Sequence, residues 1–320
     1  MRVAIIGAGH VGSTAAYALM LRALFREIVL IDANDTLASA EAADLSDATA
    51  LAHPTSIWAG TYEDAASAYI ALITAGTPTH GSETRISVAA RSALIVARCV
   101  NNLMSSGFAG IVVVAANPVD LMTSVVLRQS GLPPSRVIGT GTLLDTSRLQ
   151  QMLASALHVA PSAIGALVVG EHGDSEVIAF SSLRIGGLTV AEFASPLEEP
   201  DQLRLAKSLR EAAYQIIQGK GYTSFGIATS VVRICEAIVR DERSVLPVSS
   251  LLSGQFGIQD ICLSLPCILG REGRIRVLQP DLAELEMTEL RASAAVLQGA
   301  LAALPWPLIS PAAMPASSPT

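Results

Sequence analysis

A histidine between two glycines is the residue of this chain best suited to proton transfer. His172 lies in the segment GEHGD (170–174), directly after the apolar run 166–169. This pattern predicts a strand end where the glycines let the backbone turn sharply and leave the imidazole facing a cleft. Because the unperturbed pKa of histidine is close to neutral, the side chain can take up and return a proton in one turnover. A lone histidine can equally be structural, so the assignment depends on the residues around it.

Two arginines and an acid could complete such a site. Asp145 and Arg148 are three residues apart in a predicted helix and therefore share one face, although an ordinary surface ion pair would have the same spacing. Arg85 falls in the first turn of a helix expected from about 83 to 106, where the helix dipole disfavours a cation by up to ~1 kcal/mol. That placement suggests an anionic ligand; a solvated surface arginine is the alternative.

The N-terminus carries the pattern of a dinucleotide-binding unit. The β-branched run 3–6 leads into GAGHVG (7–12), a helical pattern follows, and a second strand ends at Asp32, 20 residues after the third glycine. Gly7 would make the tight turn, Gly9 would admit a pyrophosphate, and Gly12 would allow close helix packing. Asp32 would accept hydrogen bonds from a ribose diol and repel a 2′-phosphate, which favours NAD over NADP. The alternative is a structural glycine turn with Asp32 as a helix cap.

The alternation of strands and helices continues along the chain. Strands are expected at 69–74 and 111–115, and the loops that follow contain Gly76 and Asn117. Parallel strands with helical crossovers imply an open doubly wound sheet, whose ligands lie beyond the carboxyl ends of the strands. In the second half, strands are expected around 176–185 and 246–269, and helices near 201–218, 225–239 and 281–301. The Pro-rich end of the chain, from 305, is expected to be a mobile tail.

Composition excludes several classes of function. The length of 320 residues suggests about two domains, and the mean hydropathy of +0.48 reflects abundant alanine, with no apolar run near the ~18 residues of a spanning helix. The short apolar start is expected not to be a signal peptide. A net charge of −7 argues against nucleic-acid binding. Four cysteines without a C-x-x-C pair or a metal-ligand pattern predict buried reduced thiols, hence a reducing cytoplasm.

Seven motifs in order resemble the L-lactate/malate dehydrogenase family, and within it the bacterial L-lactate dehydrogenases. They are GAGHVG (7–12), ETR (83–85), ANPVD (116–120), LLDTSR (143–148), GEHGDSE (170–176), KGYTS (220–224) and LSLPCILG (263–270). The resemblance covers residue 1 to about 301. It implies an α/β protein with an N-terminal Rossmann domain (1–139), a C-terminal α+β substrate domain (140–303) and a tail (304–320). It also implies NAD-linked reduction of a 2-oxo acid to an L-2-hydroxy acid, by tetramers or dimers.

The resemblance assigns roles to matching positions. His172 would be the general acid/base, and Asp145 would hold its tautomer and stabilise its protonated form. Arg148 would bind the substrate carboxylate with a bidentate pair of hydrogen bonds, while Arg85 would polarise the C2 oxygen. Asn117 would hydrogen-bond the same oxygen. Thr79 and Thr223 would lie beside the substrate side chain. The expected cofactor contacts are Gly7, Gly9, His10, Val11, Gly12, Asp32, Gly76 and Asn117.

The chain departs from the family pattern at three positions. Thr79 stands where lactate enzymes typically carry Gln and malate enzymes Arg, so a second substrate carboxylate would be poorly paired and oxaloacetate should be a poor substrate. Its neighbour His80 could supply partial charge or simply be solvated. Gln150 and Gly165 replace the cations that bind fructose 1,6-bisphosphate in activated relatives, so we expect no such activation. Pyruvate is the expected substrate, with larger 2-oxo acids, malate dehydrogenase activity or a silent NAD-binding protein as alternatives.

Overall fold

The computed structural model describes residues 1–77, 85–194 and 198–308, and the side chains of 85–87 are not described. Its first unit is the one predicted from the glycine motif: β1 (Arg2–Ile6), α1 (His10–Leu21) and β2 (Glu27–Ile31), with β1 and β2 paired in parallel. The four residues 3–6 are buried, as is the face of α1 that carries Ala15, Ala16, Leu19 and Met20. Strand and helix therefore pack through apolar side chains.

Six parallel strands form the cofactor half of a larger sheet. To β1 and β2 are added β3 (Ser56–Ala59), β4 (Ile70–Ile73), β5 (Ile111–Val114) and β6 (Val137–Gly139), in the spatial order β6-β5-β4-β1-β2-β3. The order reverses between β1 and β4, where a doubly wound sheet opens its ligand crevice. The crossover helices are α2 (Asp35–Thr49), α3 (Tyr62–Ala65), α4 (Arg85–Ser105) and α5 (Val119–Ser130).

Three antiparallel strands continue this sheet beyond β6. These strands are β12 (Ser244–Ser253), β13 (Gln259–Gly270) and β14 (Gly273–Val277), and β12 pairs with β6 through Ser249 and Gly139. The strand region expected at 246–269 is therefore two strands joined by a turn at η4 (Gln255–Gly257). Gly254 and Gly257 have φ values of 123° and 77°, so this turn uses backbone conformations that favour glycine. The parallel strands and β12–β14 therefore form one continuous sheet.

The remaining elements all follow α5 in the chain. Helices α6 (Leu143–Leu157), α7 (Val190–Phe193), α8 (Glu199–Lys220), α9 (Phe225–Val239) and α10 (Glu284–Ala302) accompany the short strands β7 (Ile164–Gly165), β8 (Val168–Val169), β9 (Val177–Ile178), β10 (Arg184–Ile185) and β11 (Leu188–Thr189). Short helical turns η1 (Pro134–Arg136), η2 (Pro161–Ala163) and η3 (Phe180–Ser182) complete the chain. The single strand expected around 176–185 is wrong, because η3 separates β9 from β10.

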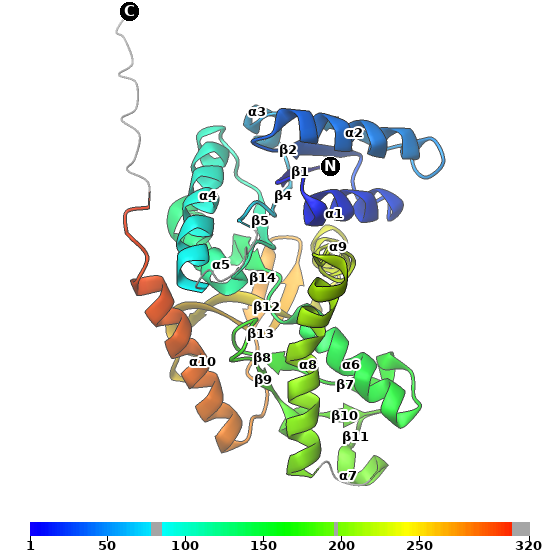
Figure 1. Cartoon of the computed structure of the whole chain (residues 1–320), viewed down its shortest axis with the longest axis vertical. Coiled ribbons are helices and arrows are strands. Elements are labelled where there is room, and N and C mark those ends of the chain that lie inside the picture. Colours follow the sequence, from blue (N-terminus) through cyan, green and yellow to red (C-terminus); the bar gives the residue numbers. More distant parts are fainter. Residues whose placement is uncertain (78–84, 195–197, 309–320) are drawn as a thin grey trace, which may run out of the picture.

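Buried side chains form one core on each face of the large sheet and a third below it. Figure 1 shows α4, α5 and α10 on one side of the sheet and α1 with α9 on the other. The third core lies between α6, α8 and the short strands. The segment from 304 does not start as a free tail: Leu304 and Leu308 are buried, and Trp306 donates a hydrogen bond to the Leu301 carbonyl at 3.1 Å. The expected mobility of 309–320 lies outside the described residues.

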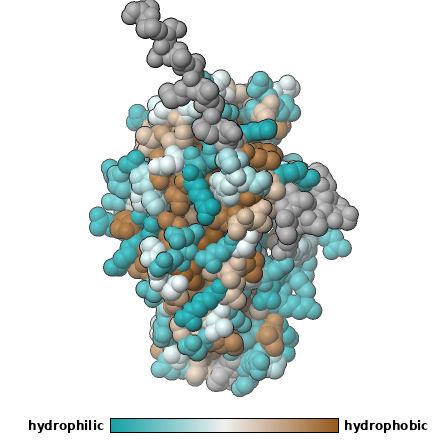
Figure 2. All heavy atoms as spheres, turned by 90° about the vertical axis from the view of Figure 1, so that its left-hand side faces the viewer, coloured by the Kyte–Doolittle hydropathy of each residue, from teal (hydrophilic) through white to brown (hydrophobic). Residues whose placement is uncertain are grey.

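Among the helices of the described ranges, none is long and apolar enough to cross a membrane. The surface that carries α4 and α10 shows apolar patches between polar bands (Figure 2). On α10 the exposed apolar side chains include Leu285 and Val296, 70% and 54% accessible. This face is therefore of mixed character.

Candidate active site

The position of His172 is set by the turn that follows β8. Gly170 has φ of 92°, and it exchanges two backbone hydrogen bonds with Ser264 of β13, at 2.9 and 3.1 Å. These bonds tie the start of the turn to the large sheet. The side chain of His172 is 27% accessible, and its Nδ1 atom contacts Asp145 of α6. The glycine-flanked strand end predicted from the sequence is confirmed.

Asp145, in the first turns of α6, contacts both His172 and Arg148. The Nδ1 atom of His172 lies 2.5 Å from Oδ2 of Asp145, and Nη1 of Arg148 donates to Oδ1 of the same carboxylate at 3.0 Å. Asp145 is 3% accessible. Since an ionised carboxylate can only accept, Nδ1 must carry the hydrogen, which leaves Nε2 to face a substrate. The acid, the arginine and the imidazole thus form one connected group.

The electrostatics of this group favour a protonated imidazole. Burial by itself lowers the pKa of His172, but the charge and hydrogen bond of Asp145 outweigh it, with contributions from Asp120 and Glu176, and the pKa rises to about 9. Burial raises the pKa of Asp145, yet His172 and Arg148 together bring it below its usual value. The pair is therefore an imidazolium beside a carboxylate at neutral pH.

Two further acids lie close to His172, and sequence reasoning assigned neither a role. Asp120 accepts the backbone N–H of His172 at 2.7 Å, and burial raises its pKa to about 6. Glu176 is 7% accessible, its Oε1 has no hydrogen-bond partner among the described residues, and burial followed by the charge of Asp145 raises its pKa to about 8. Both residues stand in quoted motifs, ANPVD and GEHGDSE, so the signal was present.

The other predicted substrate residues are placed unevenly. Asn117 is exposed and lies in the loop between β5 and α5, and Thr223 is half-buried between α8 and α9. Arg85 is the first residue of α4, but its side chain is among those not described, and Thr79 and His80 lie outside the described residues. The structure therefore joins His172, Asp145 and Arg148 by direct contacts, and places the loops of Asn117 and Thr223 at element ends.

The glycine turn fits the dinucleotide expected from its sequence. A Cβ on Gly12 would lie 1.9 Å from the Gly7 carbonyl oxygen, so helix α1 starts directly against the turn. A Cβ on Gly9 would meet nothing within 4 Å, which leaves space for a phosphate group at the N-terminus of α1. Asp32 follows β2 and accepts the Ala8 N–H at 2.7 Å, so a carboxylate stands at this turn.

The cofactor turn also touches the substrate half through an aromatic stack. The rings of His10 and Tyr222 are 3.8 Å apart with an interplanar angle of 11°, and Nζ of Lys220 lies 4.4 Å from the Tyr222 ring. Val11 follows His10 in α1, and Gly76 lies in the loop after β4. Sequence reasoning missed Tyr222, although KGYTS contains it, because nothing local shows which ring a tyrosine will meet.

Neither cavity nor metal geometry suggests a different centre within the described ranges. No group of three or more His, Cys, Asp or Glu side chains there could hold a metal ion. A cavity of about 450 Å³ lies between α5 and β13 and is lined by none of His172, Asp145 and Arg148. The four cysteines are free thiols.

Comparisons with known proteins cover nearly the whole chain. The lactate/malate dehydrogenase NAD binding domain matches residues 1–139, and the alpha/beta C-terminal domain of the same family matches 142–304. The L-lactate dehydrogenase of Thermus aquaticus is 44% identical over 95% of this chain and 99% of its own length, and that of Priestia megaterium 41% identical over 93% and 94%.

Solved structures show the same relationship. A minor L-lactate dehydrogenase from Enterococcus mundtii, in its ligands-bound form, superposes with a TM-score of 0.91 at 40% identity, covering 94% of this chain and 97% of that one. A lactate dehydrogenase from a Medee basin deep-sea metagenome library gives 0.91 at 37% identity over 94% and 98%. The predicted Rossmann-type domain with its α/β partner is confirmed. This chain belongs to the lactate/malate dehydrogenase family, and it is an NAD-dependent oxidoreductase that acts on CH–OH groups.

Proposed function

We propose that the protein is an L-lactate dehydrogenase, which interconverts pyruvate and L-lactate. The observation that carries this proposal is the contact of His172 with Asp145, and of Asp145 with Arg148. A proton donor and a carboxylate-binding guanidinium, held by one buried acid, are the two groups that a 2-oxo acid needs. The relatives named L-lactate dehydrogenase support pyruvate ahead of larger 2-oxo acids and of malate.

The mechanism follows from the residues. NADH, when bound, supplies a hydride to C2 of the 2-oxo acid. His172 donates the proton on Nε2 to the C2 oxygen, and Asp145 stabilises the imidazolium before that transfer and fixes the Nδ1 tautomer afterwards. Arg148 binds the substrate carboxylate through its free guanidinium edge. Arg85 and Asn117 would polarise the C2 oxygen as charge develops there.

Residues of the first half would hold the cofactor. The turn Gly7–Gly12 and the N-terminus of α1 would bind the pyrophosphate, because backbone N–H groups and the positive end of the helix dipole point there. Asp32 would bind the ribose diol and exclude a 2′-phosphate. His10, Val11, Gly76 and Asn117 would complete the contacts. We assign residues 1–139 to this domain, 140–303 to the substrate domain and 304–320 to the tail.

Substrate choice rests on Thr79 as a sequence proposal. Without a cation at that position, a side-chain carboxylate on the substrate has no paired charge, so oxaloacetate should be used poorly. The test compares kcat/KM for pyruvate, 2-oxoisocaproate, phenylpyruvate and oxaloacetate with NADH. Pyruvate should give the highest value; a preference for oxaloacetate would remove the proposal. As the mechanistic control, His172→Gln should keep NADH binding and lose NADH oxidation.

Assembly, regulation and compartment are proposed more briefly. We propose a homo-oligomer, supported by exposed apolar residues such as Ile216 and Ile217 of α8, with light scattering as the test. Fructose 1,6-bisphosphate should leave the KM for pyruvate unchanged, since Gln150 and Gly165 lack charge. The free state of Cys99, Cys235, Cys262 and Cys267 supports a reducing cytoplasm.

A further inference from the structure

One fully buried carboxylate beside the catalytic histidine has no part in the mechanism above. Asp120 lies in the first turn of α5 and is 1% accessible. Its Oδ2 accepts the backbone N–H of His172 at 2.7 Å, and its Oδ1 accepts the hydroxyl of Ser264 at 3.3 Å. Burying a carboxylate costs free energy unless hydrogen bonds and nearby charges compensate for it. Asp120 makes one of its hydrogen bonds to the backbone of His172, the proton donor.

We infer that Asp120 is a positioning residue for the reaction: it fixes the His172 backbone to α5, and its negative charge helps to keep the proton on the imidazole. The inference rests on the proposed function, because it assumes that His172 is the proton donor. Asp120 contacts the backbone N–H of His172, and neither the reacting atoms nor the imidazole nitrogens. Its effect would pass through the main chain and through the electric field around His172.

The hydrogen-bond network around the Asp120 carboxylate joins three elements of the fold. Ser264 belongs to β13, and its backbone pairs with Gly170, two residues before the histidine. The Ser264 hydroxyl also accepts the Thr142 N–H at 3.2 Å, while the Thr142 hydroxyl donates to the Val168 carbonyl at 2.6 Å. Asp120 therefore closes a network that holds both β8 and the turn after it against α5 and the sheet.

Asp120 also lies close to Asn117 along the chain. The two residues are three apart in the segment ANPVD, so a single rigid connection carries both the loop of Asn117 and the carboxylate that holds His172. Asn117 is proposed to contact the C2 oxygen that His172 protonates. A network that fixes one of these groups relative to the other fixes the proton path.

The negative charge of Asp120 also acts on His172. Burial raises the pKa of Asp120 to about 6, so the group is mostly ionised at pH 7 and above. Among the described residues, the charges that raise the pKa of His172 belong to Asp145 from α6, Asp120 from α5 and Glu176 from its own loop; Arg148 acts on Asp145, and Glu171 acts on Asp120. An amide would keep the hydrogen bond from the His172 backbone N–H, so Asp120→Asn removes the charge while it preserves that bond.

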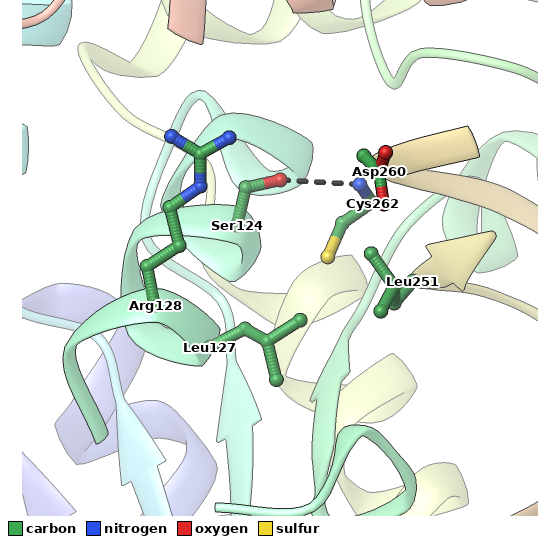
Figure 3. A pocket seen from close by; sticks show the side chains of 6 residues that line it. All are labelled: Ser124, Leu127, Arg128, Leu251, Asp260 and Cys262. Carbon is green, nitrogen blue, oxygen red and sulfur yellow. Dashed lines mark hydrogen bonds between the residues drawn. The ribbon is translucent and has the colours of Figure 1, made fainter. Parts of the chain in front are cut away.

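The same helix provides a neutral comparison one turn further on. Ser124 of α5 accepts the backbone N–H of Cys262 in β13 at 3.1 Å, and Figure 3 shows this bond beside Arg128, Leu127 and the adjacent cavity. Ser124 thus joins α5 to β13 as Asp120 does, and its hydroxyl donates to the backbone carbonyl of Asp120 at 3.0 Å, but among the described residues it makes no hydrogen bond to the histidine turn. Ser124→Ala tests the helix–strand connection without removing the buried charge.

A second control matches the chemistry of a buried carboxylate that holds a backbone N–H. Glu286 of α10 is 8% accessible, and its Oε1 accepts the Ser181 N–H at 3.0 Å. It is absent from the groups that shift the pKa of His172. Glu286→Gln therefore tests what the loss of a buried charge does to the protein without acting on His172.

The experiment measures Asp120→Asn, Asp120→Ala and both controls by three readouts: NADH affinity, the pH profile of kcat/KM for pyruvate reduction, and the titration of the His172 ring by NMR, assigned with His172→Gln. Asp120→Asn should lower the apparent pKa of His172 by about one pH unit in both the profile and the NMR titration. Asp120→Ala should lower kcat about 100-fold, with NADH affinity within about threefold. The controls should leave the His172 pKa unchanged.

An unchanged His172 titration in Asp120→Asn, or the same shift in Glu286→Gln, would overturn the inference. So would Asp120→Ala with wild-type kcat. If Asp120→Ala does not fold, Asp120→Asn decides, since it preserves shape and one hydrogen bond. The NMR titration needs no turnover, so a wild-type protein inactive toward every 2-oxo acid would defeat the proposed function and leave this inference separately testable.

Discussion

Replacing Asp145 by asparagine would separate the charge of the dyad from its shape. The carboxylate makes a 2.5 Å contact with Nδ1 of His172 and a 3.0 Å bond from Arg148, and it is 3% accessible. Asparagine occupies nearly the same volume, so packing is kept. The change removes the negative charge. It also replaces one acceptor oxygen by an amide NH2 group, so the imidazole is no longer held in the tautomer with hydrogen on Nδ1.

The size of the effect follows from the pKa of His172. A rise from 6.5 to about 9 corresponds to about 3 kcal/mol of preference for the imidazolium, most of which comes from Asp145. Without the carboxylate, burial dominates and the pKa falls to about 6 or below. At pH 8 only about one molecule in a hundred would then carry the proton, so kcat/KM for pyruvate reduction falls about 100-fold from protonation alone. Loss of the correct tautomer would add a further factor of about 10.

The assay is NADH oxidation with pyruvate and NAD reduction with L-lactate, each from pH 5 to 10. In the wild type, reduction needs the protonated imidazole, so it is full at low pH and falls as pH rises through about 9, while lactate oxidation shows the opposite trend. In Asp145→Asn the falling limb of pyruvate reduction should move below pH 7. A variant with the limb still near pH 9 would refute the reasoning, whatever its rate.

The remaining predictions concern binding and stability. Arg148→Lys should raise the KM for pyruvate about 100-fold in steady-state assays, because an ammonium cannot form the bidentate pair; a KM within threefold of wild type would contradict this. Gly12→Ala should abolish NADH binding in fluorescence titrations, since its Cβ would lie 1.9 Å from the Gly7 carbonyl oxygen; wild-type affinity would show that the turn can move. Leu290→Ala, at a fully buried site of α10, should lower the free energy of unfolding by about 3 kcal/mol in urea titrations, and a loss under 1 kcal/mol would mean the core closes around it.

The parts of the fold with strong periodicity could be predicted from the sequence. The glycine turn, α1 and β2 follow from local patterns, and α9 (Phe225–Val239) has the bounds expected for it. The region 176–185 does not form a single strand, because the chain turns at η3, where no glycine or proline signals the turn. Its direction depends on the buried Glu286, which accepts the Ser181 N–H from 105 residues away in the chain. No local pattern reports such a partner.

The residues of the candidate site also divide into those that the sequence predicts and those that it does not. His172, Asp145 and Arg148 could be found because their residue types and spacing are themselves chemical signals. Asp120 and Tyr222 could not be assigned, since each acts through a partner more than 50 residues away, the His172 backbone in one case and the His10 ring in the other. Burial decides whether an aspartate is a surface charge or part of a network, and burial is a property of the whole fold.

The continuous nine-stranded sheet limits how this enzyme can move. Because β12 pairs directly with β6, the backbone ladder runs from the nucleotide side to the substrate side without a break. The nucleotide side and the substrate side cannot rotate apart as rigid bodies without breaking the main-chain pairing between β6 and β12. Conformational change during turnover must then be local, in segments that leave the sheet, and amide exchange at β6 and β12 should be as slow in the free protein as in the ternary complex.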